Sequence, residues 1–232
     1  MKKTVSIGLT LLVMNCGSVV ASETTPGQAV SSVSVKTNLS AAEQANADFT
    51  DVLRGDALLA ALRQGGYVVY FRHATTEKDY ADQADPKMSL QNCDSQRKLS
   101  LQGIKESYAI GLAFAEKKIP IGEIITSEYC RSWKTANYAF GREDRRDSRL
   151  NFLPYEEYSD ALVQLMKKNV TPLLSARPAA GVNTVIVGHD DIFEAATGIY
   201  PEPQGIAYVI KPDGQGGFEL IANLLPAEWG QL

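Results

Sequence analysis

The sequence contains only two histidines, and each comes directly after an apolar run. His73 follows residues 67–72, and His189 follows residues 184–188. Runs of β-branched and aromatic residues of this length, next to glycine, predict short buried strands. Open α/β sheets bind their ligands at the carboxyl ends of their strands. The two imidazoles are therefore the first candidates for chemistry.

Two arginines accompany these histidines. Arg72 precedes His73, and Arg131 closes the segment that follows a third short apolar run, residues 124–126. Guanidinium groups match phosphate oxygens in bidentate geometry, and a neutral imidazole is a nucleophile near pH 7. Two imidazoles and two guanidiniums at strand ends predict phosphoryl transfer through a covalent phosphohistidine, which requires neither a metal nor another cofactor.

Other phosphatase and hydrolase chemistries lack their residues. No cysteine has an arginine six positions later, so the loop of a thiolate phosphatase is absent. No Gly-x-Ser-x-Gly sequence provides the elbow of a serine hydrolase. Two histidines without a tight His/Asp cluster do not form the usual two-metal site, and we expect no metal site.

The elements that position these residues alternate between strands and helices. This alternation predicts an α/β fold, a three-layer α/β/α sandwich with a mostly parallel central sheet and a C-terminal antiparallel hairpin. The predicted strands are residues 67–72, 124–126, 150–154, 184–188, 205–210 and 218–222. The predicted helices are residues 53–63, 100–118, 133–140, 159–174 and 192–197.

Two segments have no periodic pattern. Residues 74–98 form a long polar stretch, which predicts a cover over a site or a disordered loop. Residues 142–149 are dense in Arg, Glu and Asp and are either a solvated turn or part of what selects the substrate.

The N-terminus predicts export. Lys2 and Lys3 precede an apolar run, residues 5–14, that is too short to span a bilayer, and residues 19–21 suit a signal peptidase. We expect a signal peptide at 1–21, cleavage after Ala21, and a periplasmic or secreted protein. Lipidation at Cys16 is a weaker alternative. Residues 22–48 read as a flexible leader, and residues 49–232 as the catalytic domain.

Composition limits the partners and the redox state. A net charge of -4 gives no sign of the basic surface that binds nucleic acid, so we expect no nucleic-acid partner. We also expect no stable membrane span. The mature chain keeps Cys93 and Cys130, an even pair that suggests one disulfide in an exported protein. Such a bridge would hold the 74–98 segment over the site and leave Arg97 available to substrate. Two separate buried thiols are the alternative.

The motifs resemble those of the histidine phosphatase superfamily, which includes the cofactor-dependent phosphoglycerate mutases. The match covers residues 66 to about 211 and departs from the family at Ala74, where glycine is usual. The matching motifs are Arg72-His73-Ala74, Leu99-Ser100-x-x-Gly103, Ser127-x-x-Cys130-Arg131-x-x-x-Thr135-Ala136 and Gly188-His189.

The resemblance implies a role for each site residue. His73 would be phosphorylated, and Arg72, Arg131 and His189 would bind the phosphoryl oxygens. Arg97 and Thr75 are further candidates for contact with substrate. The proton donor is Asp190 if the chain follows the acid phosphatase branch, and Glu156 or Glu157 if it follows the mutase-like branch. Asp190 or Asp191 could instead cap the helix that follows.

Three functions remain open at this stage. The first is an exported phosphomonoesterase acting on a small phosphorylated substrate or a phosphorylated envelope component. The second is a non-catalytic module that binds such a component, for which an intact His73 would be unnecessary. The third is a mutase-type phosphoryl transferase, which fits export poorly because its substrates are cytosolic. The sequence does not identify the substrate.

Overall fold

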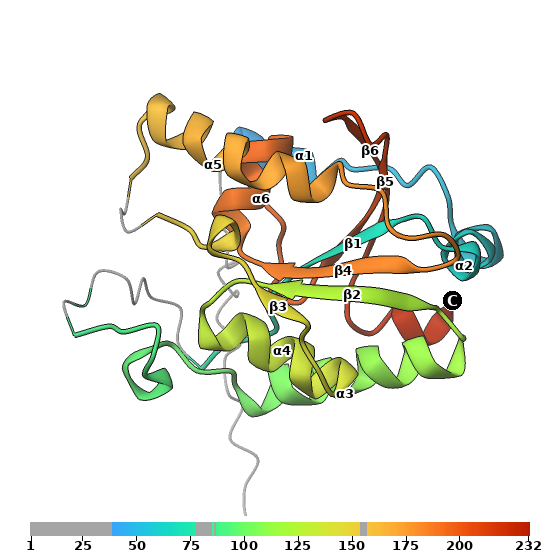
Figure 1. The fold of residues 1–232 in the computed structure, drawn as a ribbon, viewed down its shortest axis with the longest axis horizontal. Coiled ribbons are helices and arrows are strands. Elements are labelled where there is room, and N and C mark those ends of the chain that lie inside the picture. The colour runs from blue at the N-terminus through green and yellow to red at the C-terminus, as the bar shows by residue number, and fades with distance from the viewer. Residues whose placement is uncertain (1–38, 78–84, 86, 154–156) are drawn as a thin grey trace, which may run out of the picture. The chain divides into compact units, whose positions relative to one another are not determined.

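The central sheet explains how residues far apart in sequence meet. The computed structural model describes residues 39–77, 85, 87–153 and 157–232. Within these residues a six-stranded sheet has the order β3-β2-β4-β1-β5-β6 (Figure 1). Its strands are β1 (Val68–Arg72), β2 (Ile121–Thr126), β3 (Arg145–Arg146), β4 (Asn183–Gly188), β5 (Ala207–Pro212) and β6 (Phe218–Leu224).

Helices cover both faces of this sheet, so the predicted three layers are confirmed (Figure 1). The helices are α1 (Ala41–Ala47), α2 (Gly55–Gln64), α3 (Leu101–Glu116), α4 (Cys130–Phe140), α5 (Asp160–Leu174) and α6 (Asp190–Thr197). Short 3₁₀ helices lie at Cys93–Ser95, Ser148–Leu150 and Trp229–Gln231. Within the described ranges, every helix is too short or too polar to cross a lipid bilayer.

Strand β1 lies between β4 and β5 inside the sheet, and all five of its residues are buried. Its side chains alternate between two cores, as the pleat of a strand requires. Val69 and Phe71 pack with α2, α3 and α4, whereas Val68 and Tyr70 pack with α5 and α6. It pairs in parallel with β4 and antiparallel with β5, so the predicted C-terminal hairpin joins the sheet through β5.

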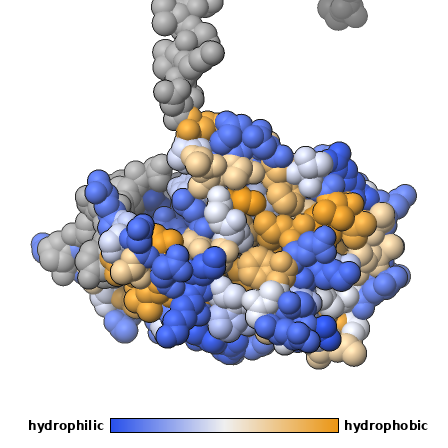
Figure 2. Space-filling view, turned by 90° about the horizontal axis from the view of Figure 1, so that it is seen from above, coloured by the Kyte–Doolittle hydropathy of each residue, from blue (hydrophilic) through white to orange (hydrophobic). Residues whose placement is uncertain are grey.

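The helices are amphipathic, and their close contacts depend on small residues. The hydroxyl of Ser100 caps α3 by accepting a hydrogen bond from the Gly103 amide at 3.0 Å, as predicted. A Cβ at Gly111 would lie 1.7 Å from the Ala139 carbonyl oxygen, so glycine lets α3 approach α4. Figure 2 shows the face seen from above, where apolar side chains gather near the middle and hydrophilic ones border them.

Several predicted boundaries need correction. The strand predicted at 150–154 is wrong, because the edge strand is β3, within the charged segment 142–149. Strand β2 begins at Ile121, α4 at Cys130 and α6 at Asp190, each a few residues earlier than predicted. The end of the predicted leader, 22–48, is also corrected because it contains α1. The predicted signal peptide, its cleavage site and Cys16 lie outside the described residues.

Candidate active site

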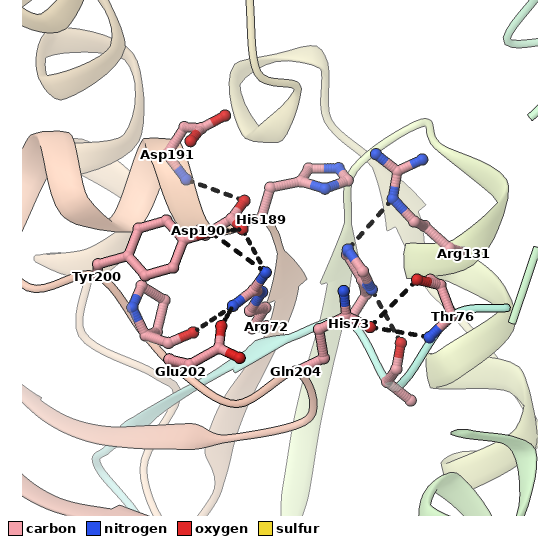
Figure 3. Close-up of polar contacts among 12 residues, drawn as sticks. Arg72, His73, Thr76, Arg131, His189, Asp190, Asp191, Tyr200, Glu202 and Gln204 are labelled. Atoms are coloured by element: carbon pink, nitrogen blue, oxygen red, sulfur yellow. Dashed lines mark hydrogen bonds and ion pairs between the residues drawn. The ribbon is translucent and has the colours of Figure 1, made fainter. Parts of the chain in front are cut away.

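Three strand ends converge at the carboxyl edge of the sheet. Arg72 of β1 is the register partner of Gly188 of β4, and the amide of His73 donates to the Gly188 carbonyl at 3.0 Å. On the other side of β4, the amide of Ser127 donates to Val187 at 3.0 Å. The rings of His73 and His189 consequently lie 5.4 Å apart. The convergence predicted from parallel strands is present (Figure 3).

The contacts of His73 define its tautomer. Its Nδ1–H donates to the Ala74 carbonyl at 2.9 Å, which leaves the lone pair on Nε2. The Nε–H of Arg131 donates to that Nε2 at 3.2 Å. The residue is 1% exposed. Burial, followed by the charges of Arg131 and Arg72, lowers the pKa of His73 well below its ordinary value. The ring is therefore neutral at pH 7, and its Nε2 lone pair faces Arg131.

Hydrogen bonds also hold the backbone on both sides of the Ala74 carbonyl, which fixes this tautomer. The Ala74 amide donates to Thr135 Oγ1 at 3.1 Å, and the Thr135 hydroxyl donates to the Arg131 carbonyl at 2.7 Å. The next carbonyl, that of Thr75, accepts from the amide of Ser100 at 2.9 Å. Helices α3 and α4 thus position the loop that carries His73.

His189 is packed by aromatic rings and held by serine. Its ring meets Phe152 and Tyr129 edge-on, and the Ser127 hydroxyl lies 2.8 Å from Nε2. Ser127 Oγ also accepts from the Tyr129 amide at 3.3 Å, so it joins the ring to the residue before α4. The other ring nitrogen, Nδ1, is buried without a hydrogen-bond partner among the described residues. Burial and then Arg131 lower the pKa of His189 well below its ordinary value.

Arg72 is surrounded by oxygen atoms. Its Nη2 lies 2.5 Å from Asp190 Oδ2, and its Nη1 donates to the Pro201 carbonyl at 2.9 Å and to the Glu202 carboxylate. The Tyr200 ring lies 5.2 Å from the guanidinium carbon, and the Tyr200 hydroxyl donates to Asp190 at 2.9 Å. Burial alone would lower the pKa of Arg72, but Asp190, Tyr200 and Glu202 raise it above its ordinary value.

These contacts leave one donor of Arg72 unused. Its Nε is buried and has no hydrogen-bond partner within the part of the chain that the structure describes. Buried donors without partners are costly and rare in folded proteins. Nδ1 of His189 is a second such atom, so two buried nitrogen atoms of the candidate site lack a partner among the described residues.

Two further guanidiniums lie near the histidines. Arg131 packs against the rings of Tyr129 and Phe152, at 4.8 and 5.3 Å from their centroids. Arg97 is 9% exposed, and its positive charge contributes to the lowered pKa of both histidines. Within the described ranges, no group of three or more His, Cys, Asp or Glu side chains could hold a metal ion.

Comparison with solved structures identifies the architecture. The protein histidine phosphatase SixA, complexed with tungstate, superposes with a TM-score of 0.50 at 14% identity, over 70% of this chain and 98% of that chain. A mutant phosphoserine phosphatase from Entamoeba histolytica, in complex with phosphoserine, gives a TM-score of 0.47 at 12% identity, over 68% and 95%. No protein-family model and no curated protein matches the sequence.

The chain has the histidine phosphatase fold. Within this fold, the structure brings together His73, Arg72, Arg131, His189 and Asp190, as the sequence predicted. Arg97 lies close enough to affect both histidines. Thr75 lies one residue beyond Ala74, but its hydroxyl donates to Glu106 at 2.8 Å.

The structure places the candidate proton donors in different surroundings. Asp190 pairs with Arg72, whereas Glu157 is exposed and Glu156 lies outside the described residues. The capping alternative is wrong for both aspartates because His189 is the N-cap of α6, and Asp190 and Asp191 lie in its first turn. Burial and the charge of Asp190 raise the pKa of Asp191 to about 6, and its carboxylate accepts from the Tyr158 hydroxyl at 3.1 Å.

The disulfide predicted between Cys93 and Cys130 is present. It joins the segment before α3 to the first residue of α4, directly before Arg131. Gln96 strengthens this link, because its Oε1 accepts from the Cys130 amide and its Nε2 donates to the Ser89 carbonyl, both at 2.8 Å. The segment that carries Arg97 is therefore attached to the segment that carries Arg131.

Sequence reasoning missed Tyr200 and Glu202. Both lie between α6 and β5, in a stretch with two prolines and no periodic pattern, and 128 and 130 positions from Arg72. Nothing in their local sequence indicated a contact with a residue so distant. The only available signal was their place after α6, near the carboxyl edge of the sheet.

Proposed function

We propose that this protein is a phosphomonoesterase that transfers the phosphoryl group of its substrate to Nε2 of His73. The observation that carries the proposal is the neutral His73, whose Nδ1–H is bound to Ala74 and whose Nε2 lone pair lies beside Arg131. A buried nucleophile that needs no deprotonation, next to guanidinium groups, suits attack on a phosphate ester.

The reaction has two steps. In the first, Nε2 of His73 forms a bond to phosphorus, the ester P–O bond breaks, and the leaving oxygen takes a proton. In the second, water attacks the phosphohistidine, the P–N bond breaks, and phosphate is released as the water proton returns to the donor. Arg72, Arg131 and His189 bind the phosphoryl oxygens, and Arg97 adds positive charge.

Asp190 is our proposed proton donor and acceptor. Arg72 contacts the carboxylates of both Asp190 and Glu202. When Asp190 carries a proton, Glu202 and the Pro201 carbonyl still hold the guanidinium in place. The arrangement thus supports a carboxyl that changes its protonation state without releasing Arg72.

We further propose that the protein is exported and acts on a small phosphorylated substrate or a phosphorylated envelope component. The disulfide supports export because such bonds persist in oxidising compartments. The similar fold of SixA, a protein histidine phosphatase complexed with tungstate, makes tungstate a suitable probe of the anion site.

The test combines turnover with trapping of the intermediate. Wild-type protein should hydrolyse an aryl phosphate in the presence of a chelator, should be inhibited by vanadate, and should carry an alkali-stable phosphoryl group on His73 after rapid quenching. His73→Ala should lose turnover and labelling but keep tungstate binding. The matched His189→Ala variant should weaken both binding and turnover.

Three results would contradict the proposal. Loss of wild-type activity on chelation would contradict a phosphohistidine mechanism. Labelling that persists in His73→Ala would place the nucleophile elsewhere. Tungstate binding without turnover of aryl or alkyl phosphates would support a non-catalytic binding module instead.

A further inference from the structure

The loop between α6 and β5 holds the guanidinium of Arg72. Three consecutive residues of this loop, Tyr200, Pro201 and Glu202, contact it through a ring, a carbonyl and a carboxylate. The Glu202 side chain is 53% exposed, so burial does little to fix its position. The position of Arg72 therefore depends on what holds the backbone of the loop.

Helix α1 supplies that support. The Tyr200 amide donates to the Ala42 carbonyl at 3.1 Å, and Asn46 Nδ2 donates to the Glu202 carbonyl at 2.8 Å. These two hydrogen bonds satisfy backbone groups on either side of Pro201. The loop segment that contacts Arg72 is thus attached to α1 at both of its ends.

Asn46 links this loop to the sheet. Its Oδ1 accepts from the Tyr208 hydroxyl of β5 at 2.5 Å, and that same hydroxyl accepts from Asn223 of β6 at 3.4 Å. The amide of Asn46 makes both contacts at once, because its oxygen accepts from Tyr208 while its nitrogen donates to Glu202. No residue of α1 is fully buried, and Ala45 packs against the core beside these polar contacts.

We propose that Asn46 is a positioning residue of the active site, which acts through the Glu202 backbone to hold the guanidinium of Arg72 in its phosphate-binding orientation. This inference rests on the proposed phosphatase function in one respect: that function makes phosphate the ligand of the Arg72 guanidinium. It gives α1, a helix remote in sequence from the histidines, a role in substrate affinity.

The sharpest test is Asn46→Asp. The carboxylate has the same shape and still accepts from Tyr208, but it cannot donate to Glu202 and repels its carbonyl oxygen. The matched control is Gln44→Glu, which makes the same amide-to-carboxylate change on an exposed residue of α1. Asn46→Ala, which removes both hydrogen bonds, is the second variant.

Two affinities should change together. We expect Asn46→Asp and Asn46→Ala to raise the Kd for tungstate, measured by calorimetry, and the KM for an aryl phosphate by about three- to tenfold, the effect of one lost hydrogen bond. The kcat should change less, and Gln44→Glu should match wild type. All variants should fold, with melting temperatures above the assay temperature.

Wild-type Kd and KM in both Asn46 variants would overturn the proposal. A fall in kcat with unchanged tungstate affinity, or failure of either variant to fold, would assign Asn46 a structural role instead. The tungstate measurement separates this inference from the proposed function. A wild-type protein that binds tungstate without turnover contradicts the phosphatase, while its Asn46 variants still test the positioning.

Discussion

At the scale of single residues, the charge state of the two imidazoles governs both chemistry and stability. Burial lowers the pKa of His73 and of His189, and nearby Arg131 lowers both further. A phosphate ester thus meets a ring that is already deprotonated. Because of the same burial, the two histidines of the folded protein stay unprotonated near pH 6.5, where the histidines of the unfolded chain bind protons.

This difference predicts that the folded state loses stability in mild acid. Below about pH 6.5 the unfolded chain protonates both histidines while the folded protein does not, so unfolding takes up protons and is favoured as pH falls. Between pH 7 and 6 the free energy of unfolding should drop on the order of 1 kcal/mol. Urea unfolding at the two pH values measures it.

The control for this prediction is His73→Asn, which should roughly halve the loss because one titrating group is gone. Asp191 acts in the opposite direction below about pH 6, because its raised pKa lets the folded state bind a proton first. The measurement is therefore cleanest above pH 6. Equal unfolding free energies at pH 7 and 6 would contradict lowered histidine pKa values.

The role of Asp190 depends on the leaving group. If Asp190 protonates the departing oxygen, Asp190→Asn should slow hydrolysis of alkyl phosphates by about 10²–10⁴-fold. The hydrolysis rate of aryl phosphates should fall far less, because their leaving groups need little protonation. Steady-state kinetics on both substrates measures the difference, with Glu157→Gln as the matched carboxyl-to-amide control. Equal effects on both substrates would remove Asp190 from this role.

At the scale of elements, the disulfide and Gln96 connect the segment before α3 to the start of α4. The two cysteines are 37 positions apart. In the chain-entropy model, a closed loop of this length stabilises the folded state by roughly 3–4 kcal/mol. The double variant Cys93→Ser, Cys130→Ser should lose about that much free energy of unfolding in urea titrations.

This disulfide prediction also has a chemical control. Intact mass should show the oxidised wild-type protein two hydrogens lighter than its dithiol form, and the serine variant should not change on reduction. Because the cross-link lies next to Arg131, the variant should also bind tungstate more weakly. Wild-type stability in the double variant would mean that packing alone holds the segment.

The elements that sequence reasoning found are those with strong apolar patterns. Strands β1 and β4 are buried at every residue and stand out as continuous runs, and helices α3 and α5 have buried residues at helical spacing. Strand β3 does not, because its two residues are Arg145 and Arg146. Polar contacts hold this edge strand, including Arg145 with Glu123 at 2.7 Å and the Asp147 amide with Thr126 at 2.8 Å. Charged residues are common on edge strands because they discourage further pairing.

Helix α1 escaped prediction for a related reason. It has no fully buried residue, Ala45 alone of its residues packs against the core, and its hydrogen bonds to the loop and the sheet reach residues more than 150 positions later. In the site, the histidines and arginines could be found because their residue types and their places after strands point to chemistry. Tyr200 and Glu202 could not, because their role comes only from the tertiary contact with Arg72.

At the scale of the whole molecule, the chain should exist outside the cytoplasm in a shortened form. Residues 1–21 have the pattern of a signal peptide, although they lie outside the described residues. The exported protein should begin at Ser22, as N-terminal sequencing and intact mass would show. Retention of residues 1–21, or a lipid on Cys16, would contradict this cleavage.

The pairing of β1 with β4 has a consequence for the order of events in refolding. Arg72 and Gly188 are neighbours in the sheet but 116 positions apart in the chain (188 − 72), so the histidines meet only after this distant pairing forms. Such non-local contacts form slowly compared with helices. After dilution from urea with the disulfide intact, the helical circular dichroism signal should return before hydrolysis of an aryl phosphate does. Simultaneous recovery would mean that β1 and β4 are already paired when the helices appear.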